Sequence, residues 1–246
     1  MIKLNFKILY PLNLYVYIEN ASKWHPFAHK VEDKFTKKQL NLLKKYLKIR
    51  KKYEDKRWFE DSFTKENLAN SLNFLKRKLP SKEFKTIKNI FYEFDSYYQR
   101  VWKKREKTLK KIARKSGKKS EKILQGKIKN LKKILNTPNL KKVNVYLSYC
   151  KNGLYGSVFG KSGILIEISK ANFKEMVFII LHELIHYADI NYGKNSLRLL
   201  KNDLGEKRAF VVHEAITMLL TQYLLKGFYR VELSSNSEWL RKVKKI

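Results

Sequence analysis

The chain has 246 residues, of which 55 are Lys or Arg and 22 are Asp or Glu, so its formal charge is +33. This length is sufficient for one large buried core or two small ones. The single cysteine, Cys150, excludes an intrachain disulfide and a four-cysteine zinc site, so any metal must be bound through nitrogen and oxygen.

The excess of positive charge has two explanations. An AT-rich genome raises Lys, Ile, Asn and Tyr together without selection for a partner, whereas a nucleic acid or another polyanion favours clustered Lys and Arg. The first explanation leaves the scarcity of acidic residues unaccounted for. Lys enrichment for thermal ion-pair networks does not explain it either, because that enrichment normally brings Glu with it.

The sequence predicts neither a signal peptide nor a membrane span. Lys3, Lys7, Pro11 and Glu19 interrupt what would have to be the apolar part of a signal peptide. The longest purely apolar run, residues 176–181, is far shorter than the roughly 20 residues that cross a bilayer. We therefore expect a cytoplasmic protein.

The N-terminal part of the chain predicts strands followed by helices. Residues 3–9 alternate polar and apolar side chains, and residues 13–18 are rich in β-branched and aromatic ones, so we expect two strands around a turn at Pro11. From about residue 31 to residue 135 apolar side chains recur with helical spacing, and Pro80 separates two of the helices.

A strongly basic segment covers residues 103–133. Its lysines lie over a thin apolar stripe, which predicts two helices with a break at Gly117. The stripe consists of Leu109, Ile112, Ile123, Ile128 and Leu131. Aligned Lys and Arg side chains attract phosphates, so the segment is a candidate surface for nucleic acid or an acidic protein. The alternative is a helix face that is simply solvated.

Beyond Pro138 the pattern changes to short strands and then one helix. Residues 143–149, 154–159 and 163–168 read as three closely spaced strands. A helix is expected over residues 172–192, where Asn172 and Glu175 supply a capping signal and Tyr192-Gly193 an end signal.

That helix contains the motif HELIH. His182 and His186 are four residues apart, so both imidazoles lie on one face and can reach a single ion, which suits tetrahedral zinc. Zinc would leave one position for water and lower its pKa toward about 7. Glu183, beside the ligands, would then act as the general base. These residues predict one catalytic Zn²⁺ ion.

This arrangement resembles the zincin metallopeptidases, and among them the thermolysin-like gluzincins, whose third ligand is a glutamate on a later helix. No third histidine follows at the spacing of the metzincins. In these families an edge strand holds the substrate backbone in extended form, and residues 154–158 occupy that position here. The resemblance covers about residues 143–225, and nothing about the N-terminal helices follows from it.

The resemblance leaves two glutamates as candidates for the third ligand. Glu206 lies 20 residues after His186, as in thermolysin, and the small side chain of Ala209 would let the helix that carries Glu206 approach the HELIH helix closely. The sequence EKRA, which begins at Glu206, also resembles the EIRA of mitochondrial inner-membrane proteases. In the same way, HELIHYAD resembles the HELIHAxD of those proteases. Glu214 lies in HEAIT, which resembles the NEAIS of thermolysin, but at 28 residues after His186. We favour Glu206 over Glu214, with His213 as a third possibility.

Other residues are candidates for supporting roles. Asp189 lies near the face of His182 and either orients a ligand imidazole or is an exposed side chain near a helix end. The resemblance also implies a Tyr or His that stabilises the oxyanion. The candidates are Tyr155, Tyr187, Tyr192 and His213.

Together these features predict an α+β, zincin-like fold, with a small twisted mixed sheet, an active-site helix and additional basic N-terminal helices. We divide the chain into an N-terminal region of strands and basic helices (1–140) and a catalytic core (141–246). The expected function is a zinc-dependent metalloendopeptidase acting on protein or peptide substrates. The alternative is a basic nucleic-acid-binding protein whose peptidase site is degenerate or acts on proteins bound to nucleic acid.

Overall fold

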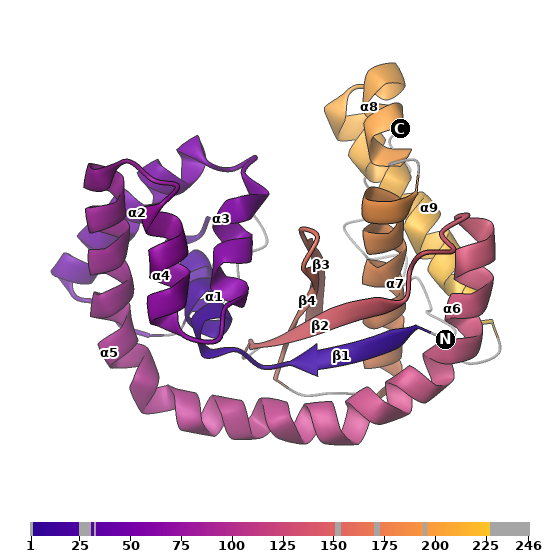
Figure 1. The fold of residues 1–246 in the computed structure, drawn as a ribbon, viewed down its shortest axis with the longest axis horizontal. Helices are drawn as coiled ribbons and strands as arrows, with labels where there is room; N and C mark the ends of the chain where they lie inside the picture. Colours follow the sequence, from indigo (N-terminus) through magenta and orange to yellow (C-terminus); the bar gives the residue numbers. More distant parts are fainter. Residues whose placement is uncertain are drawn as a thin grey trace.

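The computed structural model describes residues 2–24, 31, 33–150, 154–169, 173–193 and 196–226. It is an α+β structure in which one small sheet lies between a group of N-terminal helices and the C-terminal helices (Figure 1). In chain order the elements are β1 (Lys3–Lys7), α1 (Tyr10–Ser22), α2 (Lys37–Lys52), α3 (Arg57–Asp61), η1 (Ser62–Thr64), α4 (Leu68–Lys76), α5 (Ser81–Ile112), η2 (Ala113–Gly117), α6 (Lys118–Ile134), β2 (Lys142–Tyr149), β3 (Leu154–Phe159), β4 (Gly163–Ile168), α7 (Phe173–Tyr192), α8 (Ser196–Leu204) and α9 (Glu206–Leu224).

The sheet is mixed and has the strand order β1-β2-β4-β3. β1 pairs parallel to β2 and β2 pairs parallel to β4, whereas β3 turns back antiparallel along β4. The three predicted strands before helix α7 are confirmed, and β3 lies at an edge of the sheet, as expected for residues 154–158. The N-terminal strand β1 forms the opposite edge, so the sheet joins segments far apart in the sequence.

The two faces of the sheet belong to different cores, because successive side chains of a strand point to opposite sides. Val145, Ile164 and Ile166 pack in the core that contains α7 and α6. Tyr146 and Leu165, on the other face, pack in the core formed with α1, α2 and α5. Each face of the sheet is therefore covered by helices.

The expected second strand at residues 13–18 is wrong, because this segment belongs to helix α1. Every residue from Pro11 to Ile18 is buried, so the apolar side chains surround the helix and leave no helical periodicity. Pro11 lies in the first turn of the helix, where its missing N–H costs nothing. Asn13 anchors α1 to the sheet, since its amide donates to the carbonyl of Leu147 (3.0 Å) and accepts from the N–H of Tyr149 (3.0 Å).

The basic segment forms a curved arc of α5, η2 and α6 that runs from the N-terminal helices, below the sheet, to the side of α7 (Figure 1). The predicted break at Gly117 is wrong, because Ala113–Gly117 form a π-helical turn and the chain stays helical from α5 into α6. A β-carbon at Gly117 would lie 3.2 Å from the ring of Phe6, so the arc packs closely on β1. Among the described residues, no helix is long and apolar enough to cross a membrane.

Candidate metal centre

Helix α7 is buried over most of its length, including its polar residues. His182, Glu183 and His186 expose only 7%, 5% and 7% of their surface. The Asn172 cap predicted for this helix lies outside the described residues. Because His182 and His186 are one helical turn apart, their Nε2 atoms point to the same place and lie 3.1 Å from each other. The helix therefore presents two imidazole nitrogens to one point.

Helix α9 packs alongside α7 and brings a carboxylate to that point (Figure 1). The Oε2 atom of Glu214 lies 3.4 Å from Nε2 of His182, and its Oε1 atom lies 3.1 Å from Nε2 of His186. One ligand atom from each of these three residues lies within 4.8 Å of the others. Among the described residues, this is the group of His, Cys, Asp and Glu side chains whose spacing suits a metal ion.

The three side chains are close enough to share one ion. Ligands placed tetrahedrally at about 2.0–2.1 Å from zinc are about 3.3 Å from one another. The two Nε2 atoms are 3.1 Å apart, and each lies near a different oxygen of Glu214: Oε1 is 3.1 Å from His186 and Oε2 is 3.4 Å from His182. Burial lowers the pKa of His186, which favours the neutral imidazole that a metal requires. Burial alone would raise the pKa of Glu214, but the hydrogen bonds and charges of His182 and His186 lower it to about 2.

Two features of this group also fit a set of buried side chains that hydrogen-bond to one another without an ion. Without an ion, an imidazole N–H of one histidine can donate to the other imidazole or to Glu214, so the short distances also fit a hydrogen-bonded trio. In addition, Nδ1 of His182 is buried and has no hydrogen-bond partner among the described residues. It thus lacks the outer hydrogen bond that usually orients a ligand imidazole.

The structure brings Glu214, and not the favoured Glu206, to the two histidines. Glu206 is the first residue of α9, its side chain is 81% exposed, and its carboxylate accepts from Nζ of Lys201 at 2.8 Å. The two glutamates have similar helical phase, but eight residues separate them by about 12 Å along the helix axis. Because α8 lies within the connection from α7, the first turn of α9 is far from the histidines and its third turn reaches them.

Asp189 is buried and interacts with His213, not with His182 or His186. Its carboxylate accepts from the backbone N–H and the hydroxyl of Ser196, both at 2.8 Å, and Oδ2 lies 3.3 Å from Nε2 of His213. Burial would raise its pKa, but the hydrogen bonds from His213 and Ser196 lower it. The reading of Asp189 as an exposed side chain is therefore wrong; it connects α7 to the first turn of α8 and to α9.

Of the four oxyanion candidates, His213 is the one whose contacts bring it to the group. Its ring centroid is 4.8 Å from that of His186. The hydroxyl of Tyr187 donates instead to the carbonyl of Lys161, in the turn between β3 and β4. Tyr155 and Tyr192 are 43% and 41% exposed.

Glu183 projects from α7 against the edge strand. A β-carbon built on Gly156 of β3 would lie 2.4 Å from Cγ and 2.6 Å from Oε1 of Glu183. Burial, together with the negative charge of Glu214, raises the pKa of Glu183 to about 8. Sequence reasoning did not single out Gly156, although a glycine inside a strand pattern often marks a close approach. This glycine makes room for the Glu183 carboxylate beside the backbone of β3.

We expect Gly156→Ala to lower the free energy of unfolding by about 1–3 kcal/mol, because the new methyl group overlaps the Glu183 side chain. The same substitution should cost much less in a Glu183→Ala background, where that side chain is absent. Urea denaturation of the four proteins of this cycle, with a chelator present, measures the coupling.

The matched control is Gly126→Ala in α6, where a β-carbon meets no atom within 4 Å. That substitution should stabilise the protein by about 0.5–1 kcal/mol through helix propensity alone. If the cost of Gly156→Ala is the same with and without the Glu183 side chain, then the close contact described here is not what requires glycine.

Comparisons with known proteins return no relative: no family model, no curated protein and no solved structure matches this chain. The likeness to the zincins is therefore confined to the local motifs HELIH and HEAIT and to the strand before the helix. The role of the site must be argued from the positions and chemistry of its own side chains.

Proposed function

We propose that this protein is a zinc-dependent metalloendopeptidase of the gluzincin type. The observation that supports this most strongly is the convergence of His182, His186 and Glu214 from two helices, with their ligand atoms within 4.8 Å of one another. The order of the parts is also that of a gluzincin: an edge strand, a helix with two histidines and a glutamate, and a later helix with another glutamate. On this proposal the α+β fold is zincin-like.

The chemistry divides between the ion and the chain. A zinc ion held by His182, His186 and Glu214 would act as a Lewis acid toward the scissile carbonyl and toward water. Glu183 takes a proton from the attacking water as its oxygen bonds to the scissile carbon, and then delivers that proton to the leaving amine as the C–N bond breaks. Its buried position next to His182 suits both halves of this proton transfer.

The edge strand β3 supplies the place for an extended substrate. It pairs with β4 on one side, and among the described strands none pairs with its other side. The free backbone groups of such an edge bind a peptide as an additional strand. Because Gly156 adjoins Glu183, a peptide that follows β3 passes next to this carboxylate.

The first test is zinc content together with hydrolysis of casein or a peptide library. His182→Ala and His186→Ala should each lose the metal, because each removes one ligand. Glu183→Gln should retain stoichiometric zinc and lose at least about 100-fold in turnover, since it removes only the proton acceptor. Purified protein without zinc, or unchanged turnover in Glu183→Gln, would refute the proposal.

The second test distinguishes the two glutamates. Glu214→Gln should weaken zinc binding by at least about tenfold and abolish much of the rise in melting temperature that zinc produces, because an ion that binds only the folded state stabilises it. Glu206→Gln is the matched control and should bind zinc like the parent, since this carboxylate is exposed and paired with Lys201. The opposite result would assign the third ligand to Glu206.

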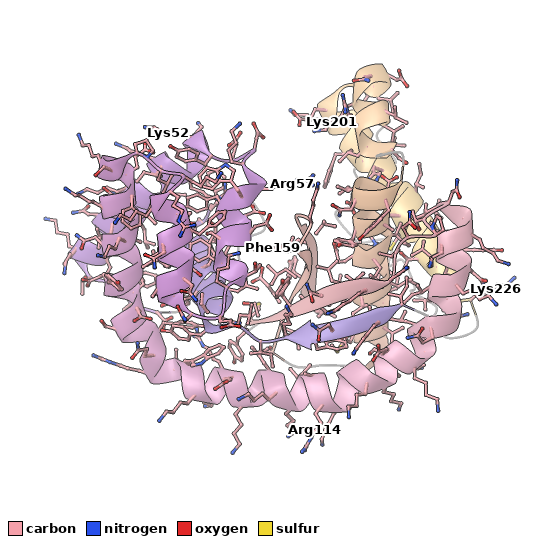
Figure 2. All side chains as sticks on the ribbon, viewed as in Figure 1. Lys52, Arg57, Arg114, Phe159, Lys201 and Lys226 are labelled. Atoms are coloured by element: carbon pink, nitrogen blue, oxygen red, sulfur yellow. The ribbon has the colours of Figure 1, made fainter. Side chains whose placement is uncertain are left out.

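A second candidate function, nucleic-acid binding, is favoured by the surface of the arc. Arg114 lies on the outer side of the arc, away from the sheet (Figure 2). Within residues 103–133 of the arc, the exposed basic residues are Lys103, Lys104, Lys107, Lys110, Lys111, Arg114, Lys115, Lys118, Lys119, Lys122, Lys129 and Lys133. The acidic Glu106 pairs with Lys110, and Glu121 accepts from the backbone N–H of Leu4, so neither forms a competing negative patch.

If this surface binds polyanions, the protein will be retained on heparin or DNA at low salt and will dissociate steeply as salt rises. The cause is that the free energy gained by releasing counterions from the polyanion falls with salt concentration. Replacing Lys107, Lys111, Lys115 and Lys118 with Gln should reduce the salt slope by roughly three to four. The control removes the same charge from exposed positions of α2, Lys44, Lys45, Lys48 and Lys51. Equal effects of the two variants would mean that the attraction is diffuse and the arc is not a specific site.

A further inference from the structure

Helix α9, which lies on the side of α7 away from the N-terminal helices (Figure 1), exposes a stripe of large apolar side chains. Ile216, Leu219 and Tyr223 are 52%, 63% and 68% exposed, and Val212 is partly exposed. At about 100° per residue these four positions lie within about 60° of one another around the helix axis, and their centre is about 170° from Glu214. This α9 stripe therefore faces away from the metal centre.

The stripe is unusual for this chain because it carries no charge. Charged residues make up 31% of the sequence, but between Ala209 and Leu225 the only one is Glu214. The exposed positions of other helices, such as α2 and α6, are mostly lysines. A face that meets only solvent has no need of large apolar side chains, because their exposure to water is unfavourable. An apolar, uncharged face at the surface therefore indicates contact with another molecule.

The spacing of the stripe suits packing against one further helix. Its residues follow one another at intervals of four, three and four, which are the steps between the a and d positions of a heptad. Ile216 and Tyr223 then occupy a positions, and Val212 and Leu219 occupy d positions. In parallel coiled coils, the combination found at Ile216 and Leu219, a β-branched residue at a with Leu at d, favours two helices over three or four.

The charge of the protein indicates which molecule supplies the second helix. An acidic partner would be attracted to the arc and would gain no electrostatic energy at the uncharged stripe. Two copies of a chain with a net charge of +33 repel one another wherever lysines face lysines. The α9 stripe lets two copies touch without bringing like charges into contact. In a symmetric pair the same patch covers its own copy, so both stripes are buried at once.

We propose that this protein forms a two-fold dimer in which the α9 stripes of two copies pack against each other. The inference does not rest on the proposed peptidase function. It bears on the metal centre nevertheless, because α9 packs on α7 with one side and on the second copy with another. Dimer formation thus holds the helix that carries Glu214 from two sides. Each copy keeps its own metal centre, since Glu214 faces away from the contact.

Sedimentation equilibrium of the full chain, treated with nuclease, tests the dimer. At concentrations up to about 100 µM the mass should rise from 29.5 kDa toward twice that value. The dimer should become stronger between about 0.1 and 0.5 M salt, because salt screens the repulsion between two basic copies. Association bridged by a polyanion would instead weaken as salt rises. A monomer at every concentration, or association that salt abolishes, overturns the inference.

Variants then place the contact on the stripe. Leu219→Lys should weaken the dimer at least about 100-fold, because it puts two like charges at the centre of the contact. Leu40→Lys in α2 is the matched control, since Leu40 is also an exposed leucine, at 47%, and lies outside the stripe. It adds the same charge and should dimerise like the parent. A dimer that survives Leu219→Lys unchanged, or is lost equally in Leu40→Lys, overturns the assignment.

A second variant keeps the dimer testable if Leu219→Lys does not fold. Ile216→Gln combined with Tyr223→Gln removes both a positions without adding a charge. Both side chains are more than half exposed, so the monomer should keep the circular dichroism spectrum of the parent. Its dimer should dissociate at least about tenfold more readily. Unchanged association of this folded double variant overturns the inference.

Discussion

The burial of four polar residues on one helix is the constraint on which the C-terminal half of this structure depends. Helix α7 lies between the sheet and α9, so His182, Glu183, His186 and Asp189 are each less than 9% exposed. A buried polar group without a partner costs about 1–3 kcal/mol, and a charged one costs more. The partners come from outside α7. Glu214 reaches the two histidines, and His213 and Ser196 reach Asp189. The positions of α8 and α9 therefore supply partners for three of these four side chains, two of which belong to the candidate metal centre.

The edge strand connects this centre to the rest of the molecule. Alternation along β3 directs Gly156 toward Glu183 and Tyr155 toward a cavity beside α1. Helix α1 is held to the neighbouring strand β2 by Asn13, whose hydrogen bonds reach the backbone of Leu147 and Tyr149. The two faces of the sheet share one backbone, so the strands that α1 packs on are hydrogen-bonded through β4 to the strand against which the Glu183 carboxylate lies.

Local patterns predicted the parts of the site that depend on local structure. The strands β2 to β4 and helix α7 have clear periodicity, and the spacing of His182 and His186 is a property of any α-helix. The rest depends on contacts distant in sequence. Helix α1 was read as a strand because a helix buried all round has no polar face. The position of Glu214 depends on how α8, which lies in the connection from α7, places α9. The cavity joins α1, α3 and β4, an encounter that no local pattern contains.

The basic residues of the arc and several of the few acidic residues of the chain lie in different places. Exposed lysines and arginines cover the outside of the arc, whereas Glu19, Glu60 and Glu167 line the cavity beside β3. The arc therefore presents a positive surface without a matching set of exposed carboxylates. As salt falls and screening weakens, this surface should attract polyanions more strongly.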